Sequence, residues 1–208
     1  MIKRFINKKP IKPTSTKVKT EIDKERFVLI ITLLLVSIIG ARTPIDSDMW
    51  WHLRAGETTW NQHEPLIQDD YSYTVFGQFW INHSWLSQVI LFLSYKLLGY
   101  FGLATWMVLT VVVTMLIVYK QCIGPPVFKS ILVVLTSVLV ALVWAPRPQL
   151  FSLLFLAIMN YLIDMYRIKQ KLVFFIIPVI MCIWGNLHAG YVYGIMLLGI
   201  LLISKVVN

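Results

Sequence analysis

The chain has 208 residues, of which 58% are hydrophobic and 14% charged, with a mean hydropathy of +0.72. This composition excludes an ordinary soluble domain and predicts an integral membrane protein with room for about seven spans of roughly 20 residues each. The net charge of +9 does not indicate nucleic-acid binding, because nine of the 19 Lys and Arg residues lie in the first 26 positions, just before an apolar run.

The first 26 residues form a basic tail, and the apolar run Phe27–Ala41 follows it. This pattern is typical of a cytoplasmic flank before a membrane anchor, or of a cleaved signal peptide. If cleavage followed Ala41, position −3 would be Ile39, which is larger than the residues such sites contain. We therefore favour an uncleaved anchor with a cytoplasmic amino terminus. The Pro and Lys content from Met1 to Lys24 predicts a segment that is disordered or bound to the membrane surface.

A polar loop at residues 42–84 separates the first apolar run from the others. It holds six of the ten acidic residues and three of the four histidines. Five of the eight tryptophans lie between Trp50 and Trp85. With a cytoplasmic amino terminus, this loop is extracytoplasmic. If the protein acts on a charged substrate, the loop is where we expect the active site.

Six more apolar segments follow the loop. The expected fold class is therefore all-α, a polytopic transmembrane helical bundle of about seven spans (residues 27–208) in a cell membrane. If every segment crosses fully, the basic connectors Lys120–Lys129 and Arg167–Lys171 lie outside, against the positive-inside rule. An interfacial or re-entrant Trp85–Leu98, which contains Ser87 and Gln88, would remove this conflict. The segments are Trp85–Leu98, Phe101–Tyr119, Ser130–Trp144, Leu150–Met165, Leu172–Trp184 and Tyr191–Val207.

Two aspartates, Asp46 and Asp48, stand shortly after the first span and are the candidate catalytic residues. A carboxyl group near the low dielectric of the membrane has a raised pKa, which suits a general base. If Met49–Glu57 is helical, His52 shares a face with Asp48 and could orient it or share a cation with it. The structural alternatives are that Asp46 caps the following helix, that Asp48 is a solvated charge and that His52 is a packing or hydrogen-bonded histidine.

The expected substrate-binding residues extend beyond His52. At the membrane surface Arg54 could hold a lipid phosphate, and Trp50 and Trp51 could stack on a sugar or simply anchor the interface. Arg147, between two prolines, is either a second phosphate ligand or a helix-end cation. His188 lies among small residues and is either a site residue or a packing residue. Glu57 completes the set.

The run from Asp46 to Glu57 resembles one found in uncharacterised bacterial multi-span proteins. Those proteins look like membrane glycosyltransferases of the GT-C superfamily, akin to protein mannosyltransferases and aminoarabinose transferases. The resemblance extends from about Phe27 onward and implies an amino-terminal module of about seven spans. It also implies a catalytic acid in the first extracytoplasmic loop and a polyprenyl-phosphate sugar donor. Further matching motifs are Asp70–Thr74, His83–Leu86, Gly99–Leu103, Arg147–Gln149 and Asn186–Gly190.

The resulting hypothesis is glycosyl transfer from a polyprenyl-phosphate-linked sugar to an acceptor at the extracytoplasmic face, with inversion. Replacing Asp46 and Asp48 together by Asn should abolish transfer and leave membrane insertion intact. Some GT-C enzymes use a divalent cation, but no metal requirement is expected here, because no second acid-rich loop follows. Such enzymes usually continue past the equivalent of Asn208, so this chain could be a fragment or need a partner chain. The alternative is a non-catalytic membrane protein, a remnant or an assembly partner. A transporter ranks last, because ionisable residues within the spans are few.

Overall fold

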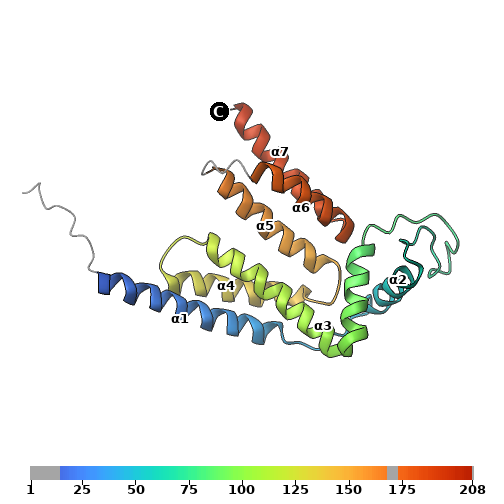
Figure 1. Cartoon of the computed structure of the whole chain (residues 1–208), viewed down its shortest axis with the longest axis horizontal. Helices are drawn as coiled ribbons and strands as arrows, with labels where there is room; N and C mark the ends of the chain where they lie inside the picture. Colours follow the sequence, from blue (N-terminus) through green and yellow to red (C-terminus); the bar gives the residue numbers. More distant parts are fainter. Residues whose placement is uncertain (1–14, 168–172, 208) are drawn as a thin grey trace, which may run out of the picture.

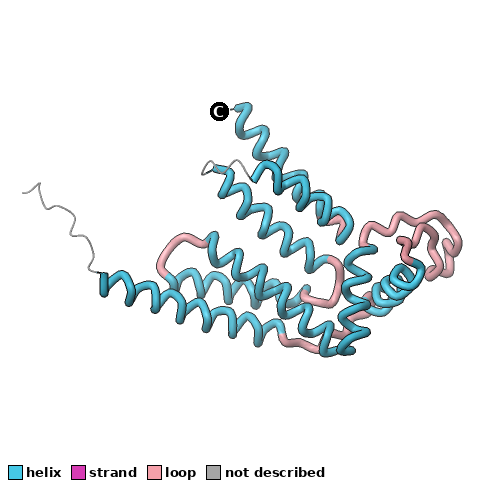
Figure 2. Tube along the Cα trace, viewed as in Figure 1, coloured by secondary structure: helices cyan, strands magenta, loops and turns pink. Residues whose placement is uncertain are grey.

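The computed structural model describes residues 15–167 and 173–207 (Figure 1). Within these ranges the chain forms seven α-helices and one 3-10 turn, and the only strand-like pairing is an isolated bridge between Gln68 and Phe79. Figure 2 shows the loops gathered mainly beside α2. The all-α prediction is confirmed. The helices are α1 (Ser15–Gly40), α2 (Met49–Gln62), α3 (Trp85–Gln121), α4 (Pro126–Val140), α5 (Gln149–Arg167), α6 (Val173–Leu187) and α7 (Tyr191–Val207), with the 3-10 turn η1 at Ala141–Val143.

Three helical segments among the described residues are long and apolar enough to cross a membrane: Trp85–Gln121, Pro126–Val143 and Gln149–Tyr166. Two shorter apolar helices, Phe175–Leu187 and Tyr191–Val207, accompany them. These helices indicate membrane association, although length and composition give fewer spans than the seven predicted. The basic connector expected at Arg167–Lys171 falls largely on residues 168–172, outside the described ranges.

Helix α1 begins at Ser15, so the end of the tail predicted to be disordered or surface-bound is helical, while residues 1–14 lie outside the described ranges. Its later half packs into the bundle. Thr32 donates a hydrogen bond to the hydroxyl of Ser130 on α4 (Oγ1–Oγ 2.6 Å), and Val36 is fully buried. The later half of α1 is therefore part of the helical bundle.

A sharp corner at Gly99 divides α3 into two parts. The residue has φ 59° and ψ −140°, a combination essentially restricted to glycine. Figure 1 shows the first part of α3 standing across the end of the bundle and the second part running back along α1 and α4. Gly102 lets the two parts approach, because a Cβ there would lie 1.9 Å from the carbonyl oxygen of Ser94. The break between two apolar segments predicted at Gly99–Tyr100 is therefore a sharp turn inside α3, at the end of the bundle.

The bundle has two chemically different ends. At the tail end, Lys129 at the start of α4 pairs with Glu25 of α1 (Nζ–Oε1 3.1 Å). At the loop end, Arg42 after α1 donates a hydrogen bond to the carbonyl of Ala141 after α4. Helices α1 and α4 thus run in the same direction, and the second part of α3 runs opposite to both. The polar loop and the α4–α5 connector meet at the loop end.

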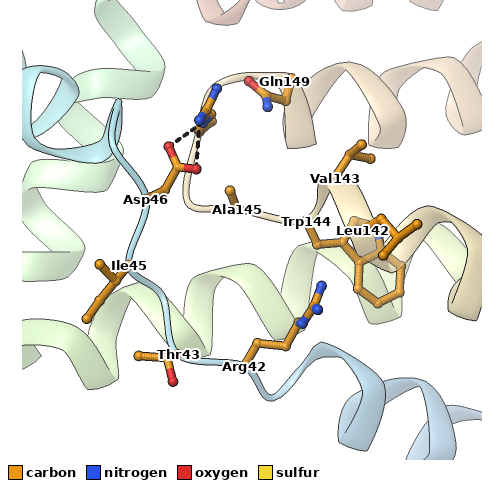
Figure 3. Close-up of a pocket in the computed structure, with 10 residues that line it drawn as sticks. Arg42, Thr43, Ile45, Asp46, Leu142, Val143, Trp144, Ala145 and Gln149 are labelled. Carbon is orange, nitrogen blue, oxygen red and sulfur yellow. Dashed lines mark hydrogen bonds and ion pairs between the residues drawn. The ribbon is translucent and has the colours of Figure 1, made fainter.

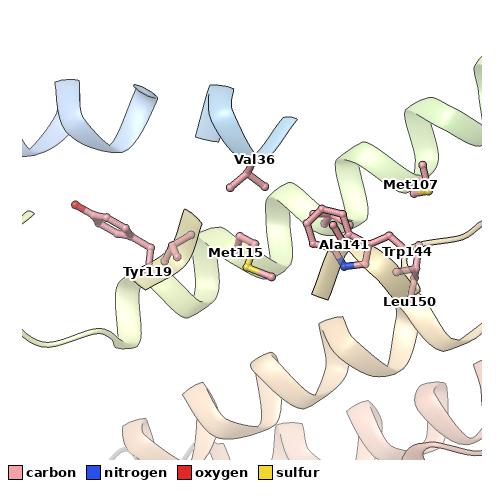
Figure 4. Close-up of a cluster of buried hydrophobic side chains, with 9 residues drawn as sticks. Val36, Met107, Met115, Tyr119, Ala141, Trp144 and Leu150 are labelled. Atoms are coloured by element: carbon pink, nitrogen blue, oxygen red, sulfur yellow. The ribbon is translucent and has the colours of Figure 1, made fainter. Parts of the chain in front are cut away.

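The main core lies where α1, the second part of α3 and the α4–η1 segment meet. Figure 4 shows Val36 of α1 facing Met115 of α3, with Trp144 and Leu150 packed farther along. These side chains are buried, whereas most outward-facing apolar side chains of α1 and α4 are exposed. Apolar outer surfaces around a packed interior are what a helical bundle in lipid requires.

Candidate functional site

The two candidate aspartates converge on Arg147. The guanidinium of Arg147 binds Asp46 through two hydrogen bonds, from Nε to Oδ1 and from Nη2 to Oδ2 (2.7 Å). Its Nη1 lies 2.6 Å from Oδ2 of Asp48. Asp46 and Asp48 lie on the α1–α2 linker, whereas Arg147 lies on the α4–α5 connector between two prolines that disfavour helix there. One arginine therefore ties the two segments together.

The surroundings make the two carboxylates chemically different. The hydrogen bond from Arg147 lowers the pKa of Asp46 below its usual value, and the backbone N–H of Asp48 also donates to Asp46 Oδ1 (2.9 Å). The expectation that membrane proximity raises the pKa of Asp46 is thus wrong, because Arg147 outweighs desolvation. The Asp46 side chain is 19% exposed and the Asp48 side chain 46% exposed. Asp48 is therefore the carboxylate that a substrate can reach.

Neither aspartate caps α2 through its side chain, so the expected capping by Asp46 is wrong. Asp48 occupies the N-cap position of α2 but makes no side-chain capping hydrogen bond. Asp46 instead accepts the backbone N–H of Asp48, which fixes the turn that enters α2.

A pocket of about 700 Å³ opens beside this ion-pair cluster. Figure 3 shows Arg42 and Asp46 extending from the linker, with Leu142, Val143 and Gln149 on the facing segment. The charged side chains Arg42, Asp46 and Arg147 share the pocket with exposed apolar ones, of which Leu142 is 82% exposed. The pocket therefore combines cationic groups with a surface suited to hydrocarbon.

His52 is buried, and its partner is not Asp48. Gln88 Nε2 lies 3.3 Å from His52 Nδ1, and Gln88 Oε1 accepts a hydrogen bond from Asn82 Nδ2 (2.8 Å). This chain makes Nδ1 the acceptor and leaves the proton on Nε2. Burial lowers the pKa of His52 to about 3, helped by the charge of Arg147. The predicted side-chain pairing of His52 with Asp48 is wrong, because the amide of Gln88 lies within reach.

His188 is held by a second polar network. The Ser152 hydroxyl donates to His188 Nδ1 (2.7 Å), and the backbone N–H of Gly190 donates to the same nitrogen (3.1 Å). Trp184 Nε1 donates to Ser152 Oγ (2.8 Å). Burial lowers the pKa of His188, and the nearby His83 lowers it further. His188 is therefore a neutral imidazole with its proton on Nε2.

Of the expected site residues, Asp46 and Arg147 line the pocket, whereas Asp48, His52 and His188 do not. The other expected residues lie on α2, also outside the pocket. Arg54 is 67% exposed and pairs with Glu57 on the outer face of α2 (Nη1–Oε2 2.8 Å). Trp50 makes an edge contact with Tyr100 at a ring distance of 6.2 Å. Trp51 packs on His52, with ring centroids 3.7 Å apart. Within the described residues, no three His, Cys, Asp or Glu side chains form a group that could hold a metal ion.

Acid is expected to destabilise the fold through His52. Its folded pKa of about 3 lies below the value of about 6.5 in the unfolded chain, so the unfolded state binds more protons between these pH values. The free energy of unfolding should therefore fall as the pH drops from about 6.5, by up to about 1.4 kcal/mol per pH unit. Thermal unfolding in lipid nanodiscs at about pH 7.5, 6 and 5 measures this slope. His52→Asn, which keeps an acceptor for Gln88, should flatten it; an unchanged slope contradicts the assignment.

Comparison with protein-family profiles, with curated proteins and with solved structures finds no significant match to this chain. The assignment of function therefore depends on the geometry described above.

Several residues of the site were not predicted from the sequence. In the sequence, Arg42 was used only as the first residue of the polar loop. A cation directly after an apolar run is nevertheless a signal for contact with a lipid headgroup. Gln88 was noted only as an unusual polar residue in an apolar segment, and that polarity was the signal for its buried hydrogen bonds. Ser152 gave no signal, since a single serine in an apolar helix is common.

Proposed function

We propose that the chain transfers a glycosyl group from a polyprenyl-phosphate-linked sugar to an acceptor at the extracytoplasmic membrane face. The observation that carries this proposal is the pocket in which Arg42 and Arg147 stand beside the exposed apolar side chains Leu142 and Val143. An anionic headgroup joined to a hydrocarbon chain matches both halves of such a pocket.

The carboxylates supply the base. Asp48 accepts the proton of the acceptor hydroxyl while that oxygen bonds to the anomeric carbon. The bond from this carbon to the phosphate oxygen breaks, and the electron pair leaves with the polyprenyl phosphate, which Arg42 and Arg147 neutralise. Attack from the face opposite the leaving group inverts the anomeric configuration. Asp46, ionised and bound through both oxygens, positions Arg147.

The two ends of the bundle favour one orientation in the membrane. The tail end carries the basic amino-terminal segment and Lys129, and the positive-inside rule places such an end in the cytoplasm. The loop end, with Asp46 and Asp48, then faces outward. The first part of α3 stands across the loop end and is not counted as a crossing. Only the second part of α3 then crosses back, so the connector Lys120–Lys129 lies on the cytoplasmic side, in agreement with the positive-inside rule. A multi-pass protein of the plasma membrane with this topology is the proposed arrangement.

One observation favours the alternative of a non-catalytic membrane protein or assembly partner. Arg147 already binds two carboxylates. A group of ion pairs like this can have a purely structural role, which is to join the α1–α2 linker to the α4–α5 connector. A chain that folds and inserts normally, yet shows no transfer with any polyprenyl-phosphate sugar, would fit this alternative.

Arg42→Gln should weaken binding of a polyprenyl phosphate by about 10- to 100-fold, because a charge-assisted hydrogen bond contributes about 1.5–3 kcal/mol. The guanidinium of Arg42 lines the pocket and donates to the carbonyl of Ala141, whereas the guanidinium of Arg147 is already bound to two carboxylates. Native mass spectrometry of nanodisc-released protein with undecaprenyl phosphate measures the affinity. Arg54→Gln, on the outer face of α2, is the matched comparison. An equal loss in both variants would show that the pocket does not select the phosphate.

A further inference from the structure

A second pocket lies beside the carboxyl-terminal end of α2, the end farther from Asp48. It has a volume of about 400 Å³, and its walls include Thr59, Trp60, His63 and Trp85. It shares no lining residue with the pocket beside Arg147. The helical rise from Asp48 to Trp60 is about 18 Å, so the two pockets are separate sites.

We propose that this second pocket binds a neutral saccharide unit. Trp60 and Trp85 supply indole surfaces on which the C–H face of a sugar ring can pack. Trp85 is held in place, because its Nε1 donates a hydrogen bond to Oδ1 of Asn186 (2.9 Å). A fixed aromatic wall with a few polar groups, in a volume within the range of small-ligand sites, is the usual form of a small-molecule pocket.

The polar groups of the pocket fit hydroxyls. Thr59 is 4% exposed, and its Oγ1 is buried with no hydrogen-bond partner within residues 15–167 and 173–207. An unpaired buried hydroxyl is unfavourable, and a turn about χ1 presents it to a ligand in the pocket. Glu64 brings a carboxylate that accepts hydrogen bonds from sugar hydroxyls and repels an anion. The lining is mostly apolar, and these few polar groups favour a neutral ligand that carries hydroxyls over an anionic phosphate.

His63 strengthens the assignment and supplies a clean test. It ends α2 in the left-handed conformation, with φ 60° and ψ 21°, and its backbone N–H donates to the carbonyl of Thr59 (3.0 Å). Glycine is the usual residue at this position, because a side chain with a Cβ is strained in the left-handed conformation. The chain places an imidazole at a strained position in the wall of the pocket. His63→Gly removes the side chain and relieves the strain, so any loss of binding cannot be attributed to unfolding.

The position of the pocket suggests which part of a substrate it holds. At about 18 Å from Asp48, a sugar in this pocket is too distant to be the reacting unit. It would hold a distal unit of an extended acceptor whose reacting hydroxyl lies at Asp48. This role as an acceptor subsite rests on the proposed function, whereas saccharide binding by the pocket does not.

The experiment uses the full chain in nanodiscs free of glycoside detergent. Tetrasaccharides of glucose, of mannose and of N-acetylglucosamine are titrated while tryptophan fluorescence and ligand saturation-transfer spectra are recorded. At least one of them should bind. Trp60→Ala and His63→Gly should each weaken that binding by about 10-fold, as expected for loss of an interaction worth about 1.4 kcal/mol. Asn61→Ala, an exposed neighbour on α2 outside the pocket walls, should bind as the unmodified chain does.

Two results would overturn the proposal: none of the three tetrasaccharides binds, or binding is unaffected in both Trp60→Ala and His63→Gly. The unfolding temperature of His63→Gly must equal or exceed that of the unmodified chain, which separates lost contact from lost fold. Repeating the titration with Asp48→Asn distinguishes the two proposals. Retained binding in that variant, together with absent transfer by the unmodified chain, would reject glycosyl transfer and leave the saccharide pocket standing.

Discussion

Asp48→Asn is expected to lower the rate constant of glycosyl transfer by about 10²- to 10⁴-fold, the usual contribution of a general base. The Asp48 side chain is 46% exposed and contacts Arg147 through one oxygen, so its other oxygen can face an acceptor hydroxyl. Asparagine keeps the size of the side chain and one oxygen for Arg147 but cannot accept the proton. Single-turnover transfer from a radiolabelled polyprenyl-phosphate sugar in nanodiscs measures the rate constant apart from donor binding.

Asp46→Asn is the informative comparison for this prediction. Asp46 binds Arg147 through both oxygens, so its replacement should loosen the α4–α5 connector and weaken donor binding as well as reduce the rate. A positioning residue therefore shows a raised KM, whereas the base shows a lowered kcat at an unchanged KM. If Asp48→Asn retains more than about a tenth of the transfer rate, Asp48 is not the base.

The helical class was predictable because it depends on composition and local pattern. Long apolar runs separated by Gly, Pro and charge specify helices in lipid whatever their partners. The corner at Gly99 was also visible, as a glycine between two apolar segments. Its consequence was not, since a glycine can be accommodated in a straight helix. Only the close approach of Gly102 to the Ser94 carbonyl shows that the two parts fold against each other.

The site was predictable in its residue types but not in its pairings. Asp46, Asp48 and Arg147 were each candidates, yet Arg147 lies 101 positions beyond Asp46, and no local pattern connects them. Helical spacing suggested Asp48 with His52, because spacing shows which residues share a face and not which partner lies opposite. Which of Arg54 and Arg147 pairs with the aspartates likewise depends on how the helices pack. In the bundle, Arg54 lies on the outer face of α2 and pairs with Glu57 instead.

Helix α2 carries both proposed sites, with Asp48 at its start and Trp60 near its end. Its placement against the first part of α3 therefore governs the base and the saccharide pocket together. The contact contains Met49 and Leu53 of α2 and Leu91 of this part of α3, joined by Leu103 from the second part, and all four are buried. A change that lifts α2 from α3 should disturb both sites at once, whereas a change within one site should leave the other intact.

Gly56→Ala is expected to cause that larger disturbance and to lower the free energy of unfolding by about 3 kcal/mol or more. A Cβ at Gly56 would lie 2.1 Å from the carbonyl oxygen of Gln88 and 2.5 Å from its carbonyl carbon. These are backbone atoms within α3, so no side-chain rotation relieves the clash and α2 must move away. The movement would also part Gln88 from His52. Denaturant titration in mixed micelles, followed by tryptophan fluorescence, measures the loss.

Gly199→Ala is the matched control, because it makes the same substitution in α7 where a Cβ meets nothing within 4 Å. Alanine has a higher helix propensity than glycine by about 1 kcal/mol, so this variant should be at least as stable as the unmodified chain. The open space beside Gly199 cannot reproduce the clash at Gly56. Equal stabilities of the two variants would mean that α2 does not pack on α3 through Gly56. Both sites would then lose the support from which their geometry is argued.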